Sequence, residues 1–117
     1  MMANFMLVLH DRLDGFSTLS HDEMMAMIKE YTAWTEKMLA EGRFLGGEKL
    51  KDEPGRQIMA GKSGIETHAG PFTETGEMIG GYMTISANDY DEAVEIAKTC
   101  PHAKYGRIEL REIDQIK

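Results

Sequence analysis

Cysteine is nearly absent from this sequence: Cys100 stands alone, so no disulfide can form within the chain. A lone thiol suits a reducing compartment, and we expect a cytoplasmic protein. No apolar run approaches the roughly 20 residues that span a bilayer. The first five residues also lack the basic and apolar regions of a signal peptide. We therefore expect neither a membrane protein nor a secreted one.

A concentrated basic patch is also missing, because 13 Lys and Arg are scattered among 20 Asp and Glu, for a net charge of −7. Such a chain repels phosphate backbones, so nucleic acid and anionic membranes are poor partners. The sequence contains no Cys-x-x-Cys and no His-x-x-x-His, and we expect no metal and no cofactor. The 117 residues include no linker-like stretch, which predicts a single domain over residues 1–117.

The first half of the chain predicts a strand, a long helix and a hairpin. Residues 4–10 alternate as a strand that is apolar on both faces, and residues 20–41 show helical spacing. Ser20 and Glu23 form a capping box at the start of this helix. Residues 43–50 are either a short strand or an ordered loop. The segments 56–60 and 65–68 are predicted to pair as a hairpin.

The second half predicts a strand, a helix and a strand. Residues 78–86 form the strand, and Gly80 and Gly81 inside it indicate a bulge or the close approach of another group. Asn88 or Asp89 caps the helix, Pro101 closes it, and residues 105–113 alternate as the last strand. The order of elements predicts an α+β fold of the ferredoxin-like kind, a split βαβ arrangement with an antiparallel sheet and both helices on one face.

Two helices cover only one face of such a sheet. The expected helix-facing set is Phe5, Leu7, Leu9, Ile79, Met83, Ile85, Ile108 and Leu110. The expected open set is Met6, Val8, His10, Met78, Tyr82, Thr84, Tyr105, Arg107, Glu109 and Arg111. The open set mixes apolar and titratable groups, which invites a second sheet. We therefore expect a homodimer with a small-molecule cavity between its two sheets. A register slip of one residue would exchange the two sets.

One motif carries a family resemblance. The run GPFTETGE over residues 70–77, followed by GGY over 80–82, resembles the YCII-related family, in particular its DGPF-type members. The resemblance covers nearly the whole chain and implies a dimeric α/β barrel, but no firm activity. For other members it implies acid–base chemistry by a histidine on the first helix and an aspartate. The corresponding stretch here, Glu30-Tyr31, carries no histidine, and Ala69 replaces the leading aspartate of the motif.

Several polar residues are candidate site residues, each with a structural alternative. His10 is either a general acid or base or a strand-end histidine bonded to a neighbour. Arg107 and Glu109, with Arg111, either bind a carboxylate or phenolate or form ion pairs with each other or across the dimer. Asp11 follows His10 but points to the opposite face.

The other candidates lie near the motif and at helix ends. Glu74 and Glu77 either share a proton or brace their loop. His68, beside Ala69, is either a polar group at the cavity mouth or a surface residue. His21 and His102 flank helix ends, and we expect both to be exposed to solvent.

Two functions of different classes fit this pattern. The first is a cofactor-free acid–base enzyme, an isomerase or lyase, acting on a small polar or aromatic molecule. In it, His10 shuttles the proton while Tyr82 and Arg107 orient the ligand. The second is a non-catalytic ligand-binding or regulatory module that uses the same cavity. A third possibility is an assembly partner whose barrel is filled and dry.

Overall fold

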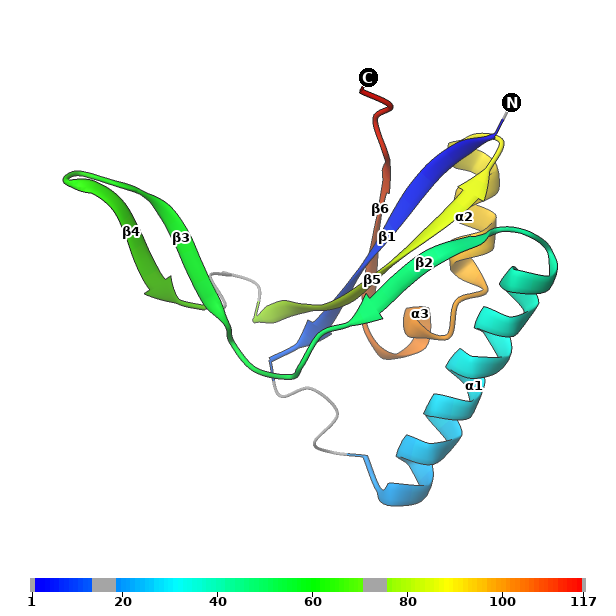
Figure 1. The fold of residues 1–117 in the computed structure, drawn as a ribbon. Helices are drawn as coiled ribbons and strands as arrows, with labels where there is room; N and C mark the ends of the chain where they lie inside the picture. The colour runs from blue at the N-terminus through cyan, green and yellow to red at the C-terminus, as the bar shows by residue number, and fades with distance from the viewer. Residues whose placement is uncertain (1, 14–18, 71–75, 117) are drawn as a thin grey trace.

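The computed structural model describes residues 2–13, 19–70 and 76–116. Its elements in chain order are β1 (Ala3–Arg12), α1 (His21–Ala40), β2 (Phe44–Lys49), β3 (Arg56–Gly61), β4 (Gly64–Ala69), β5 (Glu77–Ala87), α2 (Tyr90–Lys98), α3 (His102–Tyr105) and β6 (Arg107–Glu112) (Figure 1). Among the described helices, none combines the length and the apolar character that crossing a bilayer requires.

Four strands form one antiparallel sheet in the order β2-β5-β1-β6, and the helices lie on one of its faces (Figure 1). This order, with a helix after the first and third strands of the sheet, is the predicted ferredoxin-like arrangement. The ambiguous segment after α1 is a strand, β2, at an edge of the sheet. Within the described part of the chain, β3 and β4 form a separate two-stranded sheet that projects from the body as an arm (Figure 1).

The core lies between the sheet and the helices. Along β1, Phe5, Leu7 and Leu9 are buried while the residues between them are partly exposed, so the predicted alternation is confirmed. These side chains pack against Trp34 and Met38 of α1 and, on the other elements, Ile85, Ala93, Ala97 and Cys100. Burying a side chain of this size contributes roughly 1.5–3 kcal/mol. The face of β1 that carries Phe5 is therefore fixed by the core.

The start of α1 is capped as predicted. The Ser20 hydroxyl accepts from the Glu23 backbone N–H at 3.1 Å, and the Glu23 carboxylate accepts from the Ser20 N–H at 3.0 Å. These two bonds satisfy groups that the first turn of a helix leaves unpaired. Asp89 caps α2 in a similar way, accepting from the Glu92 N–H at 2.9 Å.

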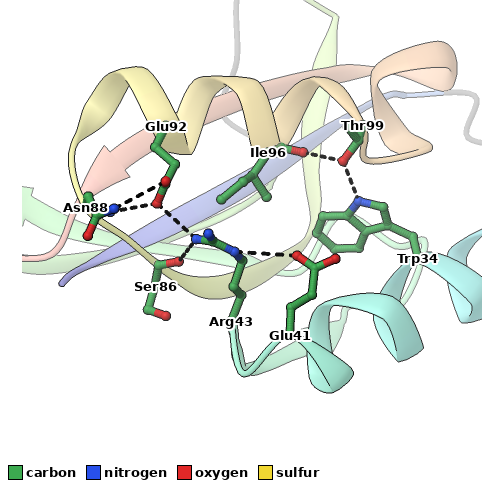
Figure 2. A network of polar contacts seen from close by, with 8 residues as sticks. All are labelled: Trp34, Glu41, Arg43, Ser86, Asn88, Glu92, Ile96 and Thr99. Atoms are coloured by element: carbon green, nitrogen blue, oxygen red, sulfur yellow. Dashed lines mark hydrogen bonds and ion pairs between the residues drawn. The ribbon is translucent and has the colours of Figure 1, made fainter.

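A polar network holds the end of α1 against α2 (Figure 2). The Arg43 guanidinium donates to the Ser86 carbonyl at 3.2 Å and to Glu92 at 3.0 Å, and it lies 3.5 Å from Glu41. Trp34 donates from its ring N–H to the Thr99 hydroxyl at 2.8 Å. These contacts hold the C-terminal half of α1 against α2. The N-terminal half of α1 instead forms one wall of a cavity whose other wall is the sheet.

A β-bulge corrects part of the predicted register. Leu9 is paired with Gly81 but His10 with Ile79, so Gly80 is the extra residue. Ile79 therefore shares the open face with His10 and is 50% exposed, whereas Met78 is opposite Asp11 on the helix-covered face. The predicted faces of Ile79 and Met78 were wrong because a bulge shifts the alternation by one residue.

Tyr105 also differs from its predicted place on the open face. It ends the short helix α3 instead of beginning β6, and its ring stacks on Tyr31 of α1 with centroids 6.5 Å apart. Pro101 stands at the N-cap of α3, where its fixed φ favours a helical turn. This turn carries Tyr105 and His102 under the helix-covered face.

Candidate active site

A cavity of about 480 Å³ lies between α1 and the helix-covered face of the sheet. This volume is within the range of small-molecule sites. Its apolar wall residues are Leu9, Met24, Met27, Ile28, Phe44 and Met83. Its polar side chains include Asp11, Tyr31, Lys49, Asp52 and His102. An apolar pocket with a few converging polar groups is typical of a binding or active site.

Asp11 is the unusual group in this cavity. It continues the buried face of β1 and is only 3% exposed. Its Oδ1 atom has no hydrogen-bond partner among the described residues, although His102 Nε2 lies 3.5 Å away. Burial raises the pKa of Asp11, and the nearby His102 and Lys49 oppose that rise without cancelling it. A carboxyl with a raised pKa in a cleft is suited to proton transfer near neutral pH.

Gly80 makes room for this carboxylate. A Cβ atom at Gly80 would lie 1.7 Å from Asp11 Oδ2, far inside van der Waals contact. Gly80 is the bulged residue of β5 and lines the cavity, so Oδ2 rests against the cavity floor. The bulge and the glycine together hold Oδ2 of Asp11 beside Gly80, while Oδ1 lies 3.5 Å from His102 Nε2.

His102 is 3% exposed, so the prediction that it faces solvent was wrong. Its ring lies 2.7 Å from the Tyr31 hydroxyl through Nδ1 and 3.0 Å from the His10 carbonyl through Nε2. Because a carbonyl oxygen only accepts, Nε2 carries the hydrogen and donates it. In the neutral ring, Nδ1 then accepts from Tyr31. Both ring nitrogens are thus occupied, and the orientation of the imidazole is fixed.

Gly106 allows this packing. A Cβ atom there would lie 2.3 Å from the His10 carbonyl oxygen and 2.7 Å from His102 Nε2. The turn between α3 and β6 therefore passes so close to β1 that only glycine fits beside the imidazole.

Tyr31 is the third member of the group. Burial raises the pKa of its hydroxyl far above the ordinary value, so it remains protonated at neutral pH and can donate. The family resemblance implies a histidine on the first helix, but here the helix supplies Tyr31. The imidazole comes from α3 instead, 71 residues along the chain. The group therefore combines side chains of β1 (Asp11), α1 (Tyr31) and α3 (His102). The sequence did not predict that these three side chains lie close together.

The open face gathers most of the predicted site residues. His10 Nε2 lies 3.0 Å from Glu109 Oε1, which lowers the pKa of Glu109, and Arg107 binds Glu77 at 3.0 Å. Tyr82 stands opposite Val8 on the same face. Within the predicted set of Arg107, Glu109 and Arg111, Arg111 Nη1 lies 3.7 Å from Glu109 Oε2, whereas Arg107 pairs with Glu77, outside that set. A ligand role for His10, Tyr82, Arg107 and Glu109 stays a prediction.

The remaining predicted residues lie elsewhere. His68 is on the arm, where its Nε2 is 3.0 Å from Glu66. Glu74 lies outside the described residues, and with it the pairing of Glu74 and Glu77. Within the residues that the structure describes, no group of three His, Cys, Asp or Glu side chains gathers as a metal site requires.

Asp11→Asn is expected to stabilise the fold at neutral pH. Burial raises the folded-state pKa of Asp11 above its usual value of 3.8, so the folded chain binds this proton more tightly than the unfolded chain does. Wild-type stability should therefore fall as pH rises from 3.8 through the folded-state pKa. The amide of the variant cannot ionise, so its stability gain should grow with pH and vanish in acid. Urea unfolding across this pH range measures it, and a pH-independent difference would contradict it.

No curated protein matches the chain. The assignment to the DGPF-type members stays a prediction. The family model of the YCII-related domain matches residues 3–117, almost the entire sequence, and the protein therefore belongs to the YCII-related family.

Proposed function

We propose that the chain is a cofactor-free proton-transfer enzyme acting on a small molecule bound in the cavity under α1. The observation that carries this proposal is the buried carboxylate of Asp11, one oxygen of which has no hydrogen-bond partner among the described residues, beside the His102–Tyr31 pair in an apolar pocket. Burying such a group costs free energy, and a protein that only needed a core would place an apolar side chain there.

Asp11 is the general base and acid of this proposal. Its Oδ2 atom takes a proton from a carbon next to a carbonyl group, and the electron pair of the broken C–H bond moves toward the carbonyl oxygen. The same carboxyl then returns the proton to another atom of the conjugated system, which completes an isomerisation. Electrons and protons balance within the substrate and Asp11, so no cofactor is required.

Tyr31 and His102 stabilise the negative oxygen in this scheme. In the structure, the Tyr31 hydroxyl donates its hydrogen to Nδ1 of His102. The Tyr31 hydroxyl can rotate this hydrogen away from Nδ1 toward a ligand oxygen in the cavity that both residues line. A hydroxyl donor held at a developing oxyanion stabilises the transition state.

The test is hydrogen–deuterium exchange at carbon. A panel of small ketones and lactones is incubated with the protein in deuterium oxide, and NMR follows the loss of α-protons. Asp11→Asn keeps the shape of the side chain but removes the base, and we expect about a 10²- to 10⁴-fold loss of the exchange rate. His10→Gln, next to it on the open face, is the matched control and should keep the wild-type rate.

Two results would count against this function. Exchange that is lost in His10→Gln but kept in Asp11→Asn would move the chemistry to the open face, as the sequence predicted. A compound that stabilises the protein but never exchanges would favour the non-catalytic binding module.

The open face supports a further part of the proposal, a homodimer. Ile79 is half exposed there, beside the partly buried Val8 and Tyr82. On the arm, Ile58 and Ile65 are 72% and 75% exposed and share one face. A lone two-stranded hairpin is marginally stable in water, so an arm of this kind gains from packing on a second chain. A second copy covering the open face would also enclose His10 and Arg107.

Ile79→Asp is expected to convert the dimer to a monomer. The change places a charge in the middle of the apolar part of the open face, where burial against a partner would leave it unpaired. Light scattering after size exclusion measures the mass. Met25→Asp, on an exposed part of α1, is the control and should remain dimeric. A wild-type chain that is monomeric at high concentration would rule out the dimer without touching the cavity under α1.

A further inference from the structure

The charges in the cavity are unevenly placed. Asp11 lies at the buried end, with its side chain 4% exposed. Lys49 lies at the open end, where it binds Asp52 at 2.9 Å and also donates to the Leu50 carbonyl. Both of these charged side chains are about half exposed. Because the Lys49 charge is paired with Asp52 at the open end, the carboxylate of Asp11 places negative charge at the deep end of the cavity.

The walls favour a flat apolar body. Met24, Met27 and Met83 bring three thioethers into the cavity, and such groups are polarisable and contact aromatic rings well. On the sheet side, Gly47 and Gly81 present backbone instead of side chains. A Cβ at Gly47 would lie 2.6 Å from the Tyr82 carbonyl oxygen, so this smooth floor is required by the strand packing itself.

We propose that the cavity selects a neutral aromatic ketone and rejects the aromatic carboxylate of the same shape. This inference rests on the proposed function, since it names the substrate class of the same site. A ketone carbonyl places its α-carbon against Asp11 Oδ2 and its oxygen near the Tyr31 hydroxyl. A carboxylate in the same position would face the buried carboxylate of Asp11 at close range, and two like charges there repel.

A competing arrangement uses Lys49 as an anchor for anions. The ammonium has three donors, and Asp52 and the Leu50 carbonyl engage two of them. An anionic ligand would therefore have to compete with Asp52 at the solvent-exposed end, where an ion pair contributes little. The two arrangements predict opposite orders of affinity, so one binding experiment separates them.

The experiment compares β-acetonaphthone with β-naphthoate, which differ by a methyl group in place of a charged oxygen. Calorimetry or NMR titration at neutral pH should give tighter binding of the ketone by about tenfold or more. In Asp11→Asn the naphthoate should gain about tenfold, while the ketone should change by less than about threefold. Glu95→Gln, which removes an exposed carboxylate of α2 outside the cavity lining, is the control and should change neither affinity.

Tighter binding of naphthoate than of the ketone, lost in Lys49→Gln, would overturn the inference in favour of the Lys49 anchor. Equal affinities unaffected by Asp11→Asn would overturn it as well, because the charge of Asp11 would then not be felt by the ligand. The proposed function fails separately: β-acetonaphthone that binds in the predicted order but does not exchange its methyl protons in deuterium oxide leaves the ligand class intact and removes the chemistry.

Discussion

Gly80→Ala is expected to lower the proposed Asp11-dependent proton exchange by about 100-fold while the chain remains folded. The new methyl group would occupy the space of Asp11 Oδ2, which is 1.7 Å from the Cβ position. The carboxylate is the end of a rotatable side chain, so it can move away at small cost in stability. A displacement of about 1 Å at a catalytic group is nevertheless enough for a loss of this size.

Two comparisons separate this effect from general damage. In an Asp11→Asn background, Gly80→Ala should cause no further loss of exchange, because both changes act through one carboxylate. Gly81→Ala is the neighbouring control. Its Cβ would lie 2.7 Å from the Glu48 backbone oxygen, so β2 must shift. We expect this shift to lower the free energy of unfolding by about 1–3 kcal/mol. Full exchange activity in Gly80→Ala would show that the position of Asp11 is not critical.

The fold was predictable because the patterns that specify it are local. Alternation in β1, the capping box at Ser20 and the turn between β3 and β4 each depend on a few neighbouring residues. The alternation also placed Asp11 on the covered face, opposite to His10. A carboxylate in line with Phe5, Leu7 and Leu9 was therefore a visible signal of a buried charge.

The partners of Asp11 were not predictable in the same way. His102 reaches it only because α3 turns back under β1, and Gly106 allows that approach. In the sequence, His102 follows Pro101 at a helix end, where a histidine is usually exposed. The bulge at Gly80 was indicated by two glycines in a strand, but its position, and so the faces of Ile79 and Met78, depends on pairing with β1. These features are long-range, and no local pattern encodes them.

Phe5→Ala is expected to lower the free energy of unfolding by about 3–5 kcal/mol. The Phe5 ring is completely buried and packs edge-on against the Tyr90 ring, with the two ring centroids 4.9 Å apart. Truncation to alanine therefore leaves a cavity between β1 and α2. The total stability of a domain is about 5–15 kcal/mol, so this single change should shift the urea midpoint strongly. The slope with urea should stay constant if the variant unfolds in the same way.

Met6→Ala, one residue further along β1, is the matched control. Met6 lies on the open face opposite Thr84, so its truncation in a single chain should cost less than about 1 kcal/mol. The measurement is made at a protein concentration low enough to keep the chain monomeric. If Met6→Ala lowered the free energy of unfolding more than Phe5→Ala does, β1 would present its other face to the core, because a strand buries alternate residues. Asp11 shares its face with Phe5, so the reversed result would place His10 in the cavity and remove the base on which the proposed chemistry depends.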